Sequence, residues 1–99
     1  MTVHDLRATL ADPQPPGDLS PLLAALWWDA KGNWSRAHEI AQEISSPAAS
    51  RVHAYLHRKE GDASNAGYWY RQASEPPAQD TLEAEWGTIA QALLRDDTA

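Results

Sequence analysis

The sequence KEGDASNA at residues 59–66 repeats the pattern of AKGNWSRA at residues 30–37. Gly61 is typical of the residue just beyond the C-terminus of one helix, because glycine adopts a left-handed conformation without strain. Asp62 is typical of the residue that caps the N-terminus of the next helix. The first copy has Gly and Asn at the same places. Each stretch therefore predicts the turn of a helix–turn–helix hairpin.

The repeat extends well beyond the two turns. A shift of 29 residues aligns Leu23–Pro47 with Val52–Pro76 and leaves six identical positions. The identical pairs are Ala25/Ala54, Gly32/Gly61, Ser35/Ser64, Ala37/Ala66, Ser45/Ser74 and Pro47/Pro76. They fall where helices end, begin or pack closely. A tandem helical hairpin of this period is typical of solenoid-type repeats.

The remaining start and stop signals predict an all-α protein with about five helices. Ser20-Pro21 and Ser46-Pro47 each pair a capping residue with a proline suited to the first helical turn. A capping box of Asp80 with Glu83 predicts the start of the final helix, and Thr2 with Asp5 does the same for a short leading helix. Predicted helices cover residues 21–31, 34–44, 47–60 and 63–74, and the final helix follows residue 80.

Composition and length predict one domain with one core. The chain has 99 residues, of which 42% are hydrophobic, with five Trp, no Phe and no Cys. We expect an N-terminal segment with a Pro-rich linker at residues 1–18, two repeats at 19–76, and a C-terminal capping helix with an acidic tail at 77–99. The sequence shows no signal peptide or membrane span, and the lack of Cys fits a reducing compartment, so we expect a cytoplasmic protein.

The charge pattern excludes some partners. The formal net charge is −6. Residues 51–71 carry four basic and two acidic side chains, whereas residues 72–99 carry one arginine and six acidic side chains. A nucleic-acid-binding protein needs a broad basic surface, which this distribution does not supply. We therefore expect no nucleic-acid partner and no membrane partner, and we read the acidic C-terminal stretch as a solvated face.

The strings EGDASNAGYWYRQA (residues 60–73) and KGNWSRAHEIAQEI (residues 31–44) resemble the second half of tetratricopeptide (TPR) and Sel1-like repeats. The matching positions are Gly61, Asp62, Ala66, Tyr70 and Ala73, and Gly32, Asn33, Trp34 and Ala37. The period of 29 is shorter than the usual value of about 34. Ala41 also replaces a preferred aromatic. The chain is similar as well to a family of small bacterial proteins without an assigned function, which implies the fold and no activity.

The resemblance implies a concave groove lined by the first helix of each repeat. It assigns Arg51, Tyr55 and Arg58 to that groove, with Trp28 and Asp29 beside them. Such a cationic and aromatic surface can clamp an acidic peptide or a terminal carboxylate. We therefore expect a protein-interaction or adaptor module that binds a peptide or a partner helix. The alternative is that these side chains form salt bridges to the acidic C-terminal region, with the final helix over the groove.

The histidines form a second candidate site. His53 and His57 lie one helical turn apart, and His38 is the nearest third imidazole by topology. The repeat register turns both toward the hairpin partner and predicts that the Tyr70 hydroxyl bonds His57. The sequence therefore favours packed histidines and predicts no metal and no cofactor. The alternative is a small-ligand-binding or catalytic protein centred on this cluster.

The aromatic side chains leave one further question open. Trp27 and Trp28 are adjacent and point about 100° apart on a helix, so they cannot share one buried seam. The aromatic rings that do not fit in that seam are either covered by the terminal segments or exposed at an interface. That interface could join the chain to a partner or to a second copy of itself in a homodimer. Without a Cys, a G-x-S-x-G turn or a phosphate-binding loop, no motif points to an enzyme.

Overall fold

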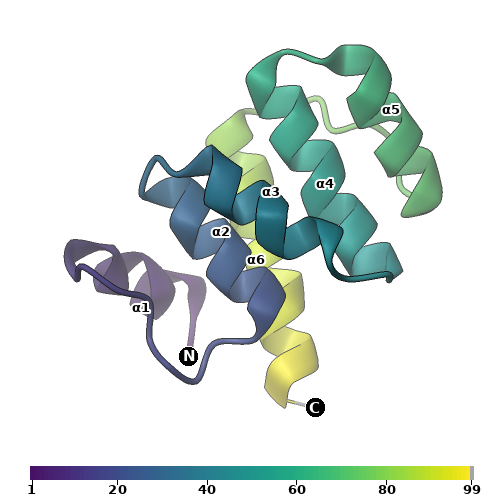
Figure 1. Ribbon diagram of the computed structural model, residues 1–99. Coiled ribbons are helices and arrows are strands. Elements are labelled where there is room, and N and C mark those ends of the chain that lie inside the picture. The colour runs from purple at the N-terminus through teal and green to yellow at the C-terminus, as the bar shows by residue number, and fades with distance from the viewer. Residues whose placement is uncertain (99) are drawn as a thin grey trace.

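The computed structural model describes residues 1–98, with side chains described through Asp96, and confirms the all-α class. The elements are α1 Val3–Ala8, the 3₁₀ turn η1 Thr9–Ala11, α2 Pro21–Ala30, α3 Trp34–Gln42, α4 Pro47–Glu60, α5 Ala63–Gln72 and α6 Leu82–Thr98 (Figure 1). Within the described range no strand is present. The helix predicted over residues 34–44 ends two residues early. Of the predicted acidic tail, the Asp97 side chain and Ala99 lie outside the described residues.

The two repeat turns have the same geometry. Gly32 and Gly61 have φ angles of 88° and 90°, the left-handed conformation that a helix end requires there. Asn33 and Asp62 each cap the following helix, accepting a hydrogen bond from the backbone N–H three residues on, at 3.0 and 3.2 Å. Each turn therefore joins two helices into a hairpin, α2 with α3 and α4 with α5.

The other predicted caps are mostly present. Thr2 forms the capping box at α1, and the Ser46 hydroxyl accepts a hydrogen bond at the start of α4. Ser20 precedes α2 without a side-chain capping bond. At α6 the predicted cap is wrong by one residue, because the Thr81 hydroxyl, not Asp80, accepts the Ala84 N–H at 3.0 Å.

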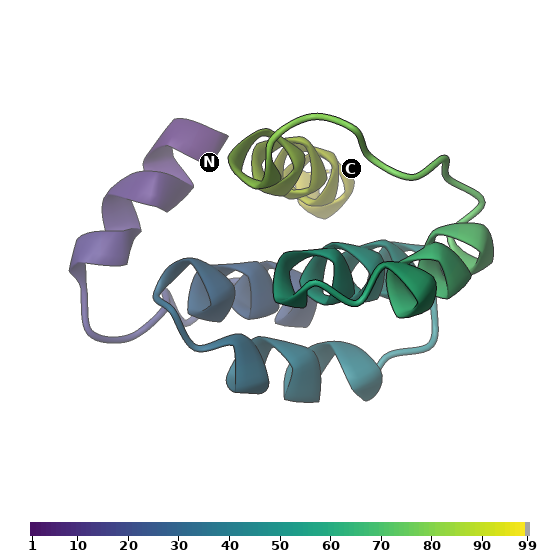
Figure 2. The ribbon, with the colours of Figure 1, turned by 90° about the horizontal axis from the view of Figure 1, so that it is seen from above.

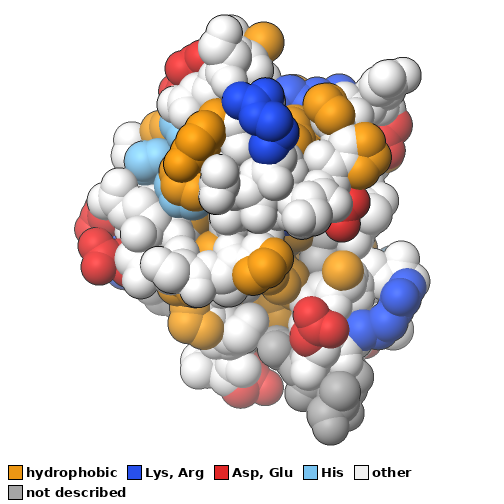
Figure 3. Space-filling model, turned by 90° about the vertical axis from the view of Figure 1, so that its right-hand side faces the viewer, with side chains coloured by type: hydrophobic (Ala, Val, Ile, Leu, Met, Phe, Trp, Pro, Cys, Tyr) orange, Lys and Arg blue, Asp and Glu red, His pale blue; other side chains and the backbone are white. Residues whose placement is uncertain are grey.

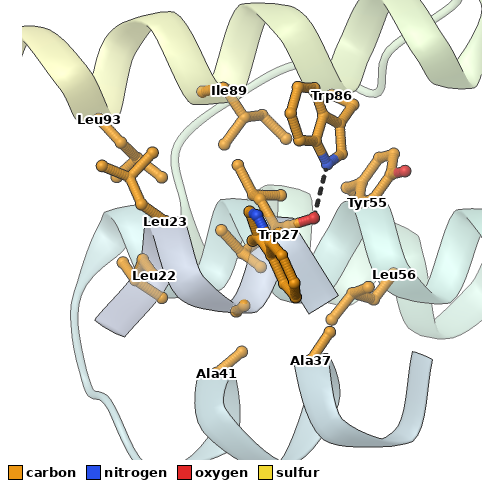
Figure 4. Close-up of a cluster of buried hydrophobic side chains, with 14 of the residues drawn as sticks. Leu22, Leu23, Trp27, Ala37, Ala41, Tyr55, Leu56, Trp86, Ile89 and Leu93 are labelled. Atoms are coloured by element: carbon orange, nitrogen blue, oxygen red, sulfur yellow. Dashed lines mark hydrogen bonds between the residues drawn. The ribbon is translucent and has the colours of Figure 1, made fainter. Parts of the chain in front are cut away.

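Helix α6 covers the face formed by the first helices of the two hairpins. Figure 2 shows α1 and α6 on one side of α2 and α4, with α3 on the other side. Trp86 lies in the core at 3% exposure, and its indole N–H donates to the Leu26 carbonyl at 2.9 Å (Figure 4). Ile89 and Leu93 are also buried and belong to the same core cluster. Burying each such side chain contributes about 1.5–3 kcal/mol, so α6 is an integral part of the core.

A separate property of these helices concerns membranes. Across the described residues, none of them combines the length and apolarity that crossing a bilayer requires.

Candidate functional site

The groove predicted to hold a peptide is filled by the chain's own final helix. Tyr55 is 3% exposed and Asp29 is 1% exposed, since both lie in the layer that α6 covers. The Tyr55 hydroxyl donates to Asp29 Oδ2 at 2.7 Å, and Lys59 Nζ donates to Asp29 Oδ1 at 2.9 Å. Burial and this bond to Asp29 raise the pKa of Tyr55 above its usual range. With α6 in place, almost none of the surface of these two residues is exposed.

The basic residues of the same groove hold a buried carboxylate of α6. The Glu85 side chain is fully buried and accepts a hydrogen bond from Arg58 Nη1 at 2.8 Å. Its other oxygen accepts the Tyr70 hydroxyl at 2.5 Å and lies 3.9 Å from Arg51 Nε. Arg58 also donates to the Asp80 carbonyl at the start of α6. Two of the predicted groove residues, Arg51 and Arg58, therefore face a carboxylate from within the same chain.

The fifth residue assigned to the groove lies at its side. Trp28 is half-buried and packs edge-to-face on Trp27, with ring centroids 5.1 Å apart. The pair resolves the question of the adjacent tryptophans: Trp27 is fully buried in the core, and Trp28 covers the edge of it. The sequence also allowed a second arrangement, in which the final helix covers the groove and the groove residues bond the acidic C-terminal region. The structure has this arrangement.

The three histidines of the second candidate site meet between α3 and α4. One ring nitrogen from each of His38, His53 and His57 lies within 4.8 Å of the others. The ring centroids of His38 lie 5.0 Å from His53 and 5.2 Å from His57. His53 and His57 project from one face of α4 because they are four residues apart. The structure thus brings together all three imidazoles of the candidate cluster.

Two tryptophans hold the outer faces of this cluster. Trp34 stacks on His38 with ring centroids 4.9 Å apart, and Trp69 of α5 stacks on His53 at 4.2 Å. The Trp34 N–H donates to the Leu56 carbonyl at 2.8 Å, which fixes that ring against α4. The imidazole planes are therefore oriented by their neighbours.

The predicted partner of His57 is wrong. Tyr70 points to the other side of α4, where its hydroxyl bonds Glu85, so it is not part of the histidine cluster. Instead, His57 Nδ1 lies 2.8 Å from Glu60 Oε1, one turn further along the same helix. Because a carboxylate accepts, Nδ1 donates in this bond, and in the neutral form of the ring Nε2 then keeps the lone pair.

Burial lowers the pKa of two of the three imidazoles, His38 and His53. His53 is 4% exposed, and its Nδ1 has no hydrogen-bond partner among the described residues. Desolvation, followed by the neighbouring His38 and His57, lowers the pKa of His53 to about 4, although a backbone bond with Ala41 opposes the shift. Desolvation and His57 also lower the pKa of His38. His38 and His53 therefore present imidazole lone pairs at neutral pH.

The lowered pKa of His53 predicts that the folded protein loses stability in acid. Below pH 6.5 the unfolded chain protonates position 53 while the folded chain does not, so stability falls as the pH drops toward about 4. A pKa difference of this size corresponds to a loss of about 3 kcal/mol. Urea unfolding between pH 7 and pH 4.5, in a chelating buffer, measures it. His53→Phe, which keeps a ring on Trp69, should flatten the profile relative to the unsubstituted chain; parallel profiles contradict the prediction.

Sequence reasoning missed four residues that shape these two sites. Trp34, Trp69 and Glu60 orient the imidazoles, and Glu85 fills the groove. Only Glu60 had a local signal, because a carboxylate three residues after a histidine on a helix lies within bonding distance. The others meet their partners through tertiary packing.

No protein-family model, curated protein or solved structure matches the chain.

Proposed function

We propose that this protein binds one divalent transition-metal ion through His38, His53 and His57. The observation that carries the proposal is the meeting of three imidazoles, His53 and His57 buried and His38 half-buried, with one ring nitrogen of each within 4.8 Å of the others.

The spacing is close to what an ion needs. Zinc binds imidazole nitrogen at about 2.0–2.1 Å, so tetrahedral ligands lie about 3.4 Å apart. Closing the rings from a spacing of up to 4.8 Å requires a small side-chain rotation. His38 is the most exposed of the three.

The protonation state also supports metal binding. An imidazole must be neutral to bind a metal, so a proton competes with the ion for the same lone pair. Because the pKa of His53 is lowered to about 4, no proton has to be displaced from it at neutral pH. The bond from His57 Nδ1 to Glu60 leaves Nε2 free and orients the ring, as a carboxylate does behind many metal-bound histidines.

The donor set favours certain ions. Imidazole suits zinc, copper, nickel, cobalt and iron, whereas magnesium and calcium prefer carboxylate and carbonyl oxygens. With three imidazoles and no thiolate, the cluster fits the first group. We therefore name Zn²⁺, Co²⁺ and Ni²⁺ as the probes.

The adaptor function stays a prediction, and the contacts of α6 do not favour it. A peptide or acidic partner helix in the groove would have to displace α6, and with it Trp86, Ile89 and the buried Glu85. No feature of the described residues indicates that α6 leaves.

Thermal unfolding with added metal tests the proposal. At a free ion concentration of about 100 times Kd, binding adds about 2.7 kcal/mol, which raises the Tm of a domain this size by roughly 10 °C or more. The rise should appear with Zn²⁺, Co²⁺ or Ni²⁺ and be absent with Mg²⁺. His53→Phe combined with His57→Phe should abolish it.

The chain supplies its own control for this experiment. His4 is exposed on α1, away from the cluster, so His4→Asn should leave the metal response unchanged. A Tm that does not respond to any of the three ions refutes the proposal, as does a response that survives the double histidine replacement.

A further inference from the structure

Three imidazoles leave the coordination of a divalent ion incomplete. Transition metals in proteins take four or more ligands, and a site with three protein ligands keeps a position for water or substrate. Among the described residues, Glu60 and Asp62 form a separate group with His57 and do not join the three rings. Glu60 is engaged by His57 Nδ1, and Asp62 caps α5. Among the described residues, no further His, Asp or Glu side chain therefore joins the three rings as a fourth ligand.

The cluster is reachable from solvent. His38 is partly exposed, and Figure 3 shows histidine side chains at the surface beside hydrophobic ones. A hollow of about 360 Å³ also opens against His53 and Trp69, between the start of α4 and the end of α5, and His53 is the one imidazole of the cluster that lines it. Its polar wall includes Ser50 and Gln72. This volume holds a small molecule of several non-hydrogen atoms.

The charge at the proposed metal site favours one kind of ligand for the open coordination position. Imidazoles are neutral ligands, so a divalent ion keeps both positive charges except for what Glu60 compensates through His57. The described residues that line the hollow carry no charged side chain, from Gln42 and Ile44 to Gln72. A negative ligand at the open position would neutralise the ion without meeting a competing carboxylate.

Resting on the metal-binding function proposed above, we infer that the ion keeps an open coordination position beside this hollow and binds a small monoanion there. A carboxylate group is the biological ligand of that chemistry. The neighbouring Trp69 ring offers an apolar wall for the carbon skeleton of such an acid.

The test uses the full chain loaded with Co²⁺, whose visible absorption reports the number and kind of its ligands. Sodium azide is the first probe, titrated at constant ionic strength, and sodium acetate is the second. We expect a saturable change in the cobalt spectrum with azide, and acetate should compete for the same position. A cobalt spectrum that does not respond to azide overturns this inference and leaves the metal site intact. Failure to take up Co²⁺ refutes the metal site itself.

A pair of serine variants tests the place of the open position. Ser50→Phe fills the hollow and should weaken azide binding by about tenfold, equal to about 1.4 kcal/mol, without changing cobalt affinity. Ser64→Phe makes the same change on an exposed part of α5, outside the hollow, and should leave azide affinity unchanged. Equal azide affinity in both variants contradicts the assignment of the hollow.

Discussion

Glu85→Ala is expected to destabilise the protein by about 3–5 kcal/mol, the usual cost of removing one partner from a buried ionic network. The substitution leaves Arg58 and the Tyr70 hydroxyl without their shared acceptor, and Arg51 without its buried counter-charge. Small domains have total stabilities of about 5–15 kcal/mol, so the loss removes a large share. Urea denaturation followed by Trp fluorescence measures it.

The same helix provides a matched control for this variant. Glu83 lies two residues before Glu85, its side chain is 83% exposed, and its only described ion pair is a 3.8 Å contact with Arg7. Glu83→Ala should therefore change stability by less than about 1 kcal/mol, as expected for a surface pair. If the two replacements have similar effects, the buried carboxylate does not hold α6 as described.

Trp86→Ala is expected to cost about 3–5 kcal/mol, the range for deleting a large aromatic side chain from a packed core. Trp86 fills the space between α6 and α2, donates to the Leu26 carbonyl and lies under the Arg7 guanidinium at 4.6 Å. Its removal loses apolar burial and leaves a cavity that rigid helices cannot close. Thermal unfolding by circular dichroism measures the change.

Trp28→Ala is the control for this second variant, since it deletes the same side chain from a half-buried place at the edge of the core. Its cost should be clearly smaller than that of Trp86→Ala. A loss below about 1 kcal/mol for Trp86→Ala would show that α6 contributes little and would revive the groove as a place for a partner helix.

The turns could be predicted from sequence because their chemistry is local. Gly61 ends α4 in a left-handed conformation and Asp62 caps α5, and both needs are met within four residues of chain. The same holds for Gly32 and Asn33. Hairpin boundaries follow from such signals, which is why the helices and their order were predictable.

The contents of the groove could not be predicted in the same way. Glu85 belongs to a run of acidic residues that reads as a solvated face, and its burial depends on Arg58, 27 residues earlier. The partner of the Tyr70 hydroxyl was predicted wrongly for the same reason, since it also depends on tertiary packing. A residue on α5 can face either the histidines or α6. The spacing of His53 and His57 was visible, but the closeness of His38 depends on how α3 packs against α4.

The bond between Trp86 and the Leu26 carbonyl joins positions 60 residues apart, which bears on the order in which the chain acquires its structure. Each hairpin closes a short loop and can form early, whereas α6 must return across most of the molecule. During synthesis from the N-terminus, the apolar faces of α2 and α4 stay bare until α6 has emerged. During that interval the exposed apolar faces make the nascent chain prone to aggregation. The core is completed only when α6 packs, which is a late step.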